Sequence, residues 1–194
     1  IHKYPTLYND DVFIQGVIDG MHVPYEDAVD YVPLGCGELV LAGKSIGSPN
    51  STFRTLKALE AVLHNGRDGA IGERIGIETG DPADFRSYHE LEEALFAQLT
   101  ERLRLDAKLH RHNREISRKE TAFVLVSLLT DDCIARGKGI LEGGVRYFGA
   151  NLEGFGLTDL ADSLTVIKKL VFEEHRYTLP QLVEILDRNF QGHE

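Results

Sequence analysis

The chain has 194 residues, 42% of them hydrophobic, which is enough for one large or two small domains with a buried core. Lysine and arginine number 21 and aspartate and glutamate 31, so the net charge of −10 would repel a phosphate backbone and excludes nucleic acid as a partner. No apolar run approaches the roughly 20 residues that a bilayer span needs, so we also expect no membrane partner.

Cysteine usage indicates a reducing compartment. The only two cysteines are Cys36 and Cys133, and the sequence has no CxxC motif and no short cluster of cysteine and histidine. Neither a disulfide framework nor a structural zinc site is therefore supported, and we predict no metal site and a cytoplasmic location.

The N-terminal quarter predicts two short helices and a strand. Apolar residues gather on one side of a helix over 9–19, with Gly20 as its stop, and a second short helix is predicted over 25–31. Proline and glycine then punctuate residues 32–48 around the apolar run Leu39–Ala42, which predicts a loop that leads into a strand.

The middle of the chain predicts two helices joined by an irregular loop. Residues 50–64 carry apolar side chains at helical spacing, and residues 67–82 contain four glycines, which is typical of a loop. A capping-box pattern of Ser87 and Glu90 begins the clearest helix, whose apolar stripe continues past Leu109.

The last third predicts three more helices and a strand. The helices are expected over 119–129, over 160–171, and after a capping box of Thr178 and Gln181. A strand is predicted over 145–148, within a glycine-dense stretch. Short strands between long helices indicate a helix-rich α/β fold, with too few strands to close a sheet alone.

Cys36 and Glu38 are the residues best placed for chemistry. They are two positions apart in a glycine-flanked stretch, and side chains at i and i+2 of an extended backbone point to the same side. A thiol and a carboxylate suit an ionic route through an activated thiolate, or a radical route in which the sulfur moves a hydrogen atom. A third interpretation makes Cys36 a small buried core residue.

Motifs in a fixed order extend over nearly all of the chain. Gly35-Cys36-Gly37-Glu38 follows a short helix with an acidic turn, Asn65-Gly66-x-Asp68 and Thr79-Gly80 come later, and Gly143-Gly144-Val145-Arg146-Tyr147 follows them. Ala161-Asp162-Ser163-Leu164 then precedes Ile167-Lys168-Lys169-Leu170-Val171-Phe172. In this order the motifs resemble those of glycyl radical enzymes of the pyruvate formate-lyase family.

The resemblance implies that the chain is one piece of a longer enzyme. In that family the cysteine loop, here near residues 33–48, lies inside a barrel of about ten strands, and a separate C-terminal segment carries the radical. That segment has no counterpart here, and the chain opens on Ile1. We therefore expect residues 1–194 to form a middle-to-late part of the barrel domain.

The resemblance also assigns roles. Cys36 would hold a thiyl radical, Glu38 would act as general base, and Arg146 and Tyr147 are candidates for the substrate pocket. The fragment itself would bind no cofactor. A radical S-adenosylmethionine activating enzyme with an iron–sulfur cluster would install the glycyl radical, the full-length protein would be a homodimer, and the substrate would be a small molecule.

The single cysteine indicates the branch of the family. Pyruvate formate-lyase itself uses two adjacent cysteines, whereas Gly37 follows Cys36 here, which disfavours formate C-acetyltransferase activity. The motif is more similar to the dehydratases, C–N and C–S lyases and decarboxylases. Leu39 stands where many dehydratases have proline, and Phe148 where an asparagine is frequent.

Other readings remain open beside a radical lyase. A non-catalytic helical interaction module would keep Cys36 in its core, and an ionic cysteine enzyme would lower the pKa of its thiol. Cys133 is expected to be a buried structural cysteine. His110 and His112 are two positions apart on a predicted helix, do not face each other, and indicate a solvated basic face.

Overall fold

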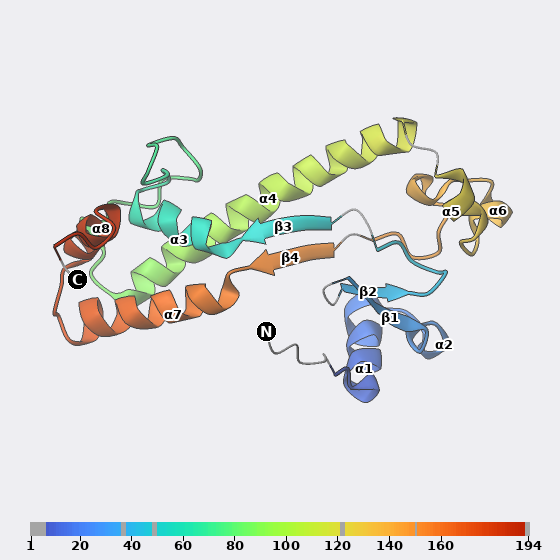
Figure 1. Ribbon diagram of the computed structural model, residues 1–194, viewed down its shortest axis with the longest axis horizontal. Coiled ribbons are helices and arrows are strands. Elements are labelled where there is room, and N and C mark those ends of the chain that lie inside the picture. The colour runs from blue at the N-terminus through green and yellow to red at the C-terminus, as the bar shows by residue number, and fades with distance from the viewer. Residues whose placement is uncertain (1–6, 36–37, 48–49, 121–122, 150, 193–194) are drawn as a thin grey trace. The chain divides into compact units, whose positions relative to one another are not determined.

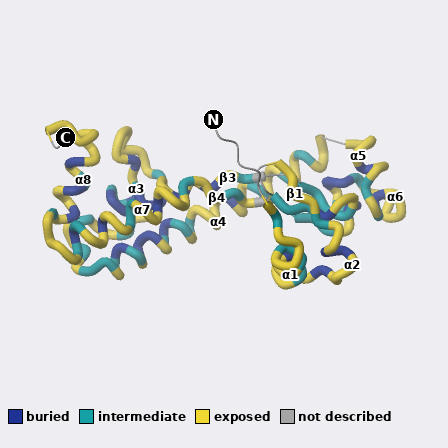
Figure 2. Tube along the Cα trace, turned by 60° about the horizontal axis from the view of Figure 1, so that its bottom comes forward, coloured by how far each residue is buried: buried dark blue, intermediate teal, exposed yellow. Residues whose placement is uncertain are grey.

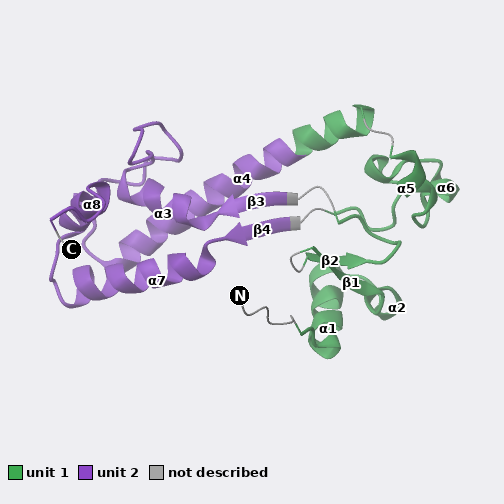
Figure 3. Cartoon of the chain, in the orientation of Figure 1, with its two compact units in different colours: residues 1–50, 111–151 green, residues 51–110, 152–194 purple. Residues whose placement is uncertain are grey.

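The computed structural model describes residues 7–35, 38–47, 50–120, 123–149 and 151–192, and Figure 1 labels their helices and strands. The chain divides into two compact units, each built from two separate stretches of sequence (Figure 3). Unit 1 comprises residues 1–50 and 111–151, and unit 2 comprises residues 51–110 and 152–194.

Unit 1 begins with the helices α1 (Asp10–Met21) and α2 (Tyr25–Ala28). The Asn9 side chain caps α1 by accepting hydrogen bonds from the first-turn amides of Asp11 and Val12. The predicted helix over 9–19 is confirmed, but α1 continues through Gly20. The second helix is shorter than its predicted range of 25–31, because Tyr31 is already the first residue of a strand.

The hairpin of unit 1 pairs β1 (Tyr31–Leu34) with β2 (Glu38–Leu41) in antiparallel register. The predicted strand over 39–42 corresponds to β2, whereas β1 falls in the stretch predicted as loop. One face of the hairpin packs on a small core through Tyr31, Leu39 and Leu41. That core also contains buried residues of α1, α2 and their connection: Val17, Val23 and Ala28.

The second half of unit 1 contains the end of α4 (Tyr88–Glu120), then α5 (Val124–Leu128), α6 (Cys133–Arg136) and the 3-10 turn η2 (Ile140–Glu142). The predicted helix over 119–129 is wrong at its start, because Lys119 and Glu120 still belong to α4. The predicted strand over 145–148 is also wrong, since Tyr147 forms only an isolated bridge with Ser45. Cys133 is 3% exposed in a core cluster, as predicted.

Unit 2 has a two-stranded sheet of β3 (Asn50–Arg54) and β4 (Asn151–Phe155). The prediction of one helix over 50–64 is therefore wrong in its first five residues, and α3 (Thr55–Leu63) forms the rest. The Thr55 hydroxyl donates a hydrogen bond of 2.9 Å to the Phe155 carbonyl, which ties the start of α3 to the end of β4.

Helices α3, α4, α7 (Leu157–Ile167) and α8 (Leu179–Asp187) supply the core of unit 2, where Figure 2 marks buried residues in dark blue. A π-helical turn, η3 (Lys168–Glu173), continues α7 and adds Val171 to this core. The predictions for α4, for the helix over 160–171 and for the capping box of α8 are confirmed. None of the helices in the described ranges is long and apolar enough to cross a bilayer.

The loop between α3 and α4 lacks regular structure except for the 3-10 turn η1 (Pro82–Asp84), as predicted for residues 67–82. Gln98 of α4 is 3% exposed and holds this loop. Its amide accepts a hydrogen bond from the Ile77 amide at 3.1 Å and donates to the Ile77 carbonyl at 2.7 Å and to the Thr79 hydroxyl at 3.2 Å.

Candidate functional site

The predicted catalytic loop connects β1 to β2 in unit 1. Cys36 and Gly37 lie outside the described residues, whereas Gly35 and Glu38 on either side of them are described. The register pairs Leu34 with Glu38. Gly35 has a φ of 58°, a left-handed conformation that glycine adopts without the steric cost that a Cβ would add.

Glu38 is half-buried, and its carboxylate lies against the backbone of Gly35. A Cβ added at Gly35 would be only 3.0 Å from the Glu38 Oε2 atom. The residue begins β2 and shares its face of the hairpin with Leu34 and Val40, opposite the face that packs on the core. Gly47 packs on this outer face, since a Cβ there would be 2.4 Å from the Leu34 side chain.

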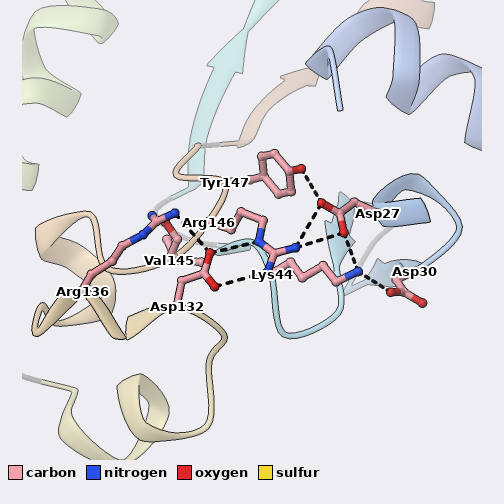
Figure 4. Close-up of polar contacts among 8 residues, drawn as sticks. All are labelled: Asp27, Asp30, Lys44, Asp132, Arg136, Val145, Arg146 and Tyr147. Atoms are coloured by element: carbon pink, nitrogen blue, oxygen red, sulfur yellow. Dashed lines mark hydrogen bonds and ion pairs between the residues drawn. The ribbon is translucent and has the colours of Figure 1, made fainter. Parts of the chain in front are cut away.

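An ion network with one buried carboxylate lies at the open end of the same hairpin (Figure 4). Asp27 of α2 is 5% exposed and is the centre of this network. Its carboxylate accepts hydrogen bonds from Lys44 Nζ at 2.6 Å, from Arg146 Nη1 at 3.2 and 3.3 Å, and from the Tyr147 hydroxyl. Lys44 also contacts Asp30 at 2.7 Å.

Arg146 connects this carboxylate to a second one. Its Nε and Nη2 atoms donate to the two oxygens of Asp132 at 3.0 and 3.2 Å, a bidentate geometry that planar guanidinium groups favour. Arg136 completes the network by donating to Asp132 at 3.1 Å and to the Val145 carbonyl at 2.8 Å. In this cluster three carboxylates therefore face three cationic side chains.

The contacts of Asp27 determine how it titrates. The hydrogen bond from Lys44 and those from Tyr147 and Arg146 lower the pKa of Asp27 to about 2, although its burial opposes this shift. The same contact raises the pKa of Lys44 to about 12, and the hydrogen bond to Asp27 raises the pKa of Tyr147. Asp27 is therefore a permanent anion at neutral pH.

These contacts give Asp27 a different chemical role from the one predicted for Glu38. The acceptor positions of Asp27 are occupied by Lys44, Arg146 and Tyr147, so Asp27 is not available to take a proton from a substrate. Arg146 and Tyr147, the candidates for the substrate pocket, both use polar atoms to bind Asp27, and their contact with substrate stays a prediction. The catalytic roles of Cys36 and Glu38 stay predictions too.

Sequence reasoning did not assign a role to Asp27, Lys44 or Asp132. Asp27 belongs to the acidic turn, Glu26-Asp27-Ala28, that precedes the cysteine loop in the sequence. Its partners are 17 and 119 residues away along the chain, so no local spacing could have indicated them. The structure shows what the sequence did not, since Asp27 and its neighbour Ala28 are both buried.

Other candidate residues are placed less favourably for chemistry. Burial raises the pKa of the Cys133 thiol, which disfavours its thiolate. His110 and His112 are both on α4, and the described residues contain no group of three or more side chains that could hold a metal ion. A pocket of unit 2 is lined by Lys57 and Arg102, but both cations are paired with carboxylates.

The sequence is similar to that of known proteins. Residues 2–194 match the family described as "Pyruvate formate lyase-like". The chain is 35% identical over 190 residues to trans-4-hydroxy-L-proline dehydratase from Clostridioides difficile, with 98% of this chain and 24% of the relative covered. It is 33% identical to (2S)-3-sulfopropanediol dehydratase from Klebsiella oxytoca, with 100% and 23% covered.

The fold is similar as well. A crystal structure of hydroxyproline dehydratase from Clostridioides difficile, with its substrate trans-4-hydroxy-L-proline bound, matches with a TM-score of 0.91 and 35% identity. The match covers 97% of this chain and 24% of that structure. The predicted helix-rich α/β fold is confirmed by this likeness, and the chain spans about a quarter of the length of the relatives that it matches.

Proposed function

Because the chain belongs to the pyruvate formate lyase-like family, we propose that the full-length protein is a glycyl radical lyase in which Cys36 and Glu38 carry the reaction. It would dehydrate a small organic substrate, cleave its C–N or C–S bond, or decarboxylate it. One observation carries the proposal: the Glu38 carboxylate lies against Gly35, next to Cys36 in the sequence, at the closed end of a hairpin.

Cys36 would transfer a hydrogen atom and Glu38 would transfer a proton. Cys36 would become a thiyl radical by giving up its thiol hydrogen atom to a glycyl radical elsewhere in the full-length protein. Cys36 sulfur then takes a hydrogen atom from a substrate carbon, and Glu38 accepts the proton of a hydroxyl on that carbon. The bond from the neighbouring carbon to its leaving group then breaks, and the leaving group departs with the bonding electron pair and takes up the proton from Glu38. The product radical recovers its hydrogen atom from the Cys36 thiol, so the cycle is redox-neutral.

The proposal extends to the rest of the protein. Residues 1–194 would belong to the middle-to-late part of a barrel domain, and the radical-bearing glycine to another segment of the gene product. The partner would be a radical S-adenosylmethionine activating enzyme with an iron–sulfur cluster. The full-length enzyme would be a cytoplasmic homodimer with Arg146 and Tyr147 at its substrate pocket.

The test uses the complete gene product, made anaerobically with its activating enzyme. We expect a glycyl doublet in the electron paramagnetic resonance spectrum of wild type, Cys36→Ala and Glu38→Gln alike. Turnover should be lost in Cys36→Ala and should fall about 100- to 10,000-fold in Glu38→Gln, because a positioned base contributes that much. Glu26→Gln removes an exposed carboxylate of the same unit and is the matched control.

The substrates of the two dehydratase relatives, trans-4-hydroxy-L-proline and (2S)-3-sulfopropanediol, are the first compounds to assay. They test dehydration of a ring and of an open chain. An absent doublet in activated wild-type enzyme would contradict the proposal and favour a non-catalytic module. A doublet together with full turnover in Cys36→Ala would leave the enzyme class intact but remove Cys36 from the mechanism.

A further inference from the structure

The hairpin that carries Glu38 is too short to specify its own register. Only four residue pairs join β1 to β2, and an isolated two-stranded hairpin is at best marginally stable in water. Val32 and Leu34 on its outer face are 42% and 46% exposed, so that face is only partly covered, by the close approach of Gly47 to Leu34 and Val40. The face that packs on the core disfavours a slip of one residue, and contacts at the base of the hairpin add to this preference.

Asp27 and Lys44 provide the first of these contacts. Asp27 precedes β1 and Lys44 follows β2, so their 2.6 Å contact closes the open end of the hairpin (Figure 4). The backbone continues the ladder beyond the last pair, since the Ala42 amide donates to the Asp30 carbonyl at 2.9 Å. A shift of β2 by one residue moves its atoms about 3.3 Å along the strand, which would break a contact of this length.

Backbone groups outside the hairpin also bind the two residues Gly43 and Lys44, which follow β2. The Tyr147 amide donates to the Lys44 carbonyl at 2.9 Å, and the Asp131 amide donates to the Gly43 carbonyl at 2.8 Å. The Arg146 and Tyr147 side chains meet on the Asp27 carboxylate. Asp27 therefore connects the strand before the cysteine loop, the residues after it, and the stretch from 131 to 147.

Register decides which face of the hairpin Glu38 occupies. Side chains alternate between faces, so a slip of one residue would turn Glu38 from the outer face toward the apolar core that contains Leu41. There its carboxylate would be desolvated and could no longer lie against Gly35. The position of Glu38 thus depends on contacts four residue pairs away.

We propose that Asp27 is a positioning residue for Glu38, because it fixes the register in which β1 pairs with β2; this inference rests on the function proposed above for Glu38. Asp27 takes no part in proton or hydrogen-atom transfer. It orients the residue that does, through its contacts with Lys44 and Arg146.

The test compares Asp27→Asn with wild type in the activated full-length enzyme. We expect an unchanged glycyl doublet and an unchanged KM, with kcat lower by about 100-fold, the effect of misplacing a catalytic group by about 1 Å. Hydrogen–deuterium exchange should become faster in peptides that cover residues 31–41. Lys44→Arg, which keeps the positive partner, should retain more of kcat than Lys44→Met.

Asp68→Asn is the matched control. Asp68 of unit 2 is 8% exposed and contacts Lys57 at 2.7 Å, so this variant also removes an ion pair between a lysine and a buried aspartate. It should lower stability without changing kcat or exchange at 31–41. If Asp27→Asn does not fold, Lys44→Met provides the same comparison with Asp27 still paired to Arg146.

Either of two results would overturn the inference. One is an Asp27→Asn enzyme with the kcat and exchange of the Asp68→Asn control. The other is a lower kcat with unchanged exchange at 31–41, since Asp27 would then act by some route other than register. Wild-type enzyme with neither doublet nor turnover would contradict the proposed lyase instead, and the exchange comparison would still decide whether Asp27 fixes the hairpin.

Discussion

At the scale of single residues, the absence of a side chain at Gly35 leaves room for the Glu38 carboxylate. Gly35→Ala places a Cβ in a left-handed conformation, which costs about 1–2 kcal/mol, and 3.0 Å from Glu38 Oε2. We therefore expect a lower free energy of unfolding and a displaced carboxylate, measured by urea unfolding and by turnover of the full-length enzyme. Gly16→Ala is the control, because an added Cβ meets no atom within 4 Å there. It should stabilise α1 by about 0.5–1 kcal/mol. Equal unfolding curves for Gly35→Ala and wild type would refute this reading of the loop.

Because of the low pKa of Asp27, we expect the stability of unit 1 to fall at acidic pH. Its pKa is about 2 in the folded chain against an ordinary value of 3.8, so its contribution to stability is present above 3.8 and is lost as the pH falls toward 2. The difference in unfolding free energy between wild type and Asp27→Asn should therefore shrink over that interval. Urea unfolding at a series of pH values measures it, and a difference that stays constant from neutral pH to pH 2 would contradict the assignment.

At the scale of elements, Gln98 determines whether the loop after α3 stays attached to α4. Gln98→Leu removes three hydrogen bonds to Ile77 and Thr79, which we expect to cost about 1–3 kcal/mol. The loop over 67–81 should become sensitive to limited proteolysis, and the midpoint of thermal unfolding should fall. Glu93→Ala, at an exposed position of the same helix, should change neither measurement. Unaltered proteolysis of Gln98→Leu would show that backbone contacts alone hold the loop.

Helices α1, α4, α7 and α8 could be predicted from the sequence, because caps and apolar stripes are local signals. The strands were harder to predict, because their pairing partners can lie far along the chain. Phe53 continues the helical spacing of α3, yet it lies in β3, whose partner β4 is about a hundred residues away along the chain. Val145–Phe148 has strand-like composition but finds no ladder beyond the bridge at Tyr147.

The candidate site divides in the same way. Cys36 and Glu38 could be identified because they are two positions apart in a glycine-flanked motif. Asp27 could not, because its role depends on Lys44 and Arg146, and only the folded chain brings their charges together. Residues that act on a substrate can be marked by a local motif, whereas residues that hold them in place are marked by partners far along the chain.

At the scale of the whole molecule, a large amount of apolar surface is exposed in this chain. Leu125, Leu129 and Ile134 are 71%, 76% and 69% exposed in and beside α5 and α6. Apolar surface of this kind marks contact sites or causes aggregation. We expect residues 1–194 produced alone to self-associate in size-exclusion chromatography with light scattering, and Leu125→Lys with Leu129→Lys to reduce this. A stable, cooperatively folding monomer would favour a self-sufficient interaction module.

The interleaving of the two units has a consequence for synthesis on the ribosome. The hairpin of β1 and β2 emerges before the side chain of Arg146 that pairs with Asp27, which is 119 residues further along. At about 5–20 residues per second, the nascent hairpin waits on the order of ten seconds for this partner. During that interval Asp27 has only Lys44 to pair with, and unit 2 has begun but lacks α7 and α8. Neither unit can complete its core before the other has largely been translated, so a slow step between residues 51 and 151 would delay both.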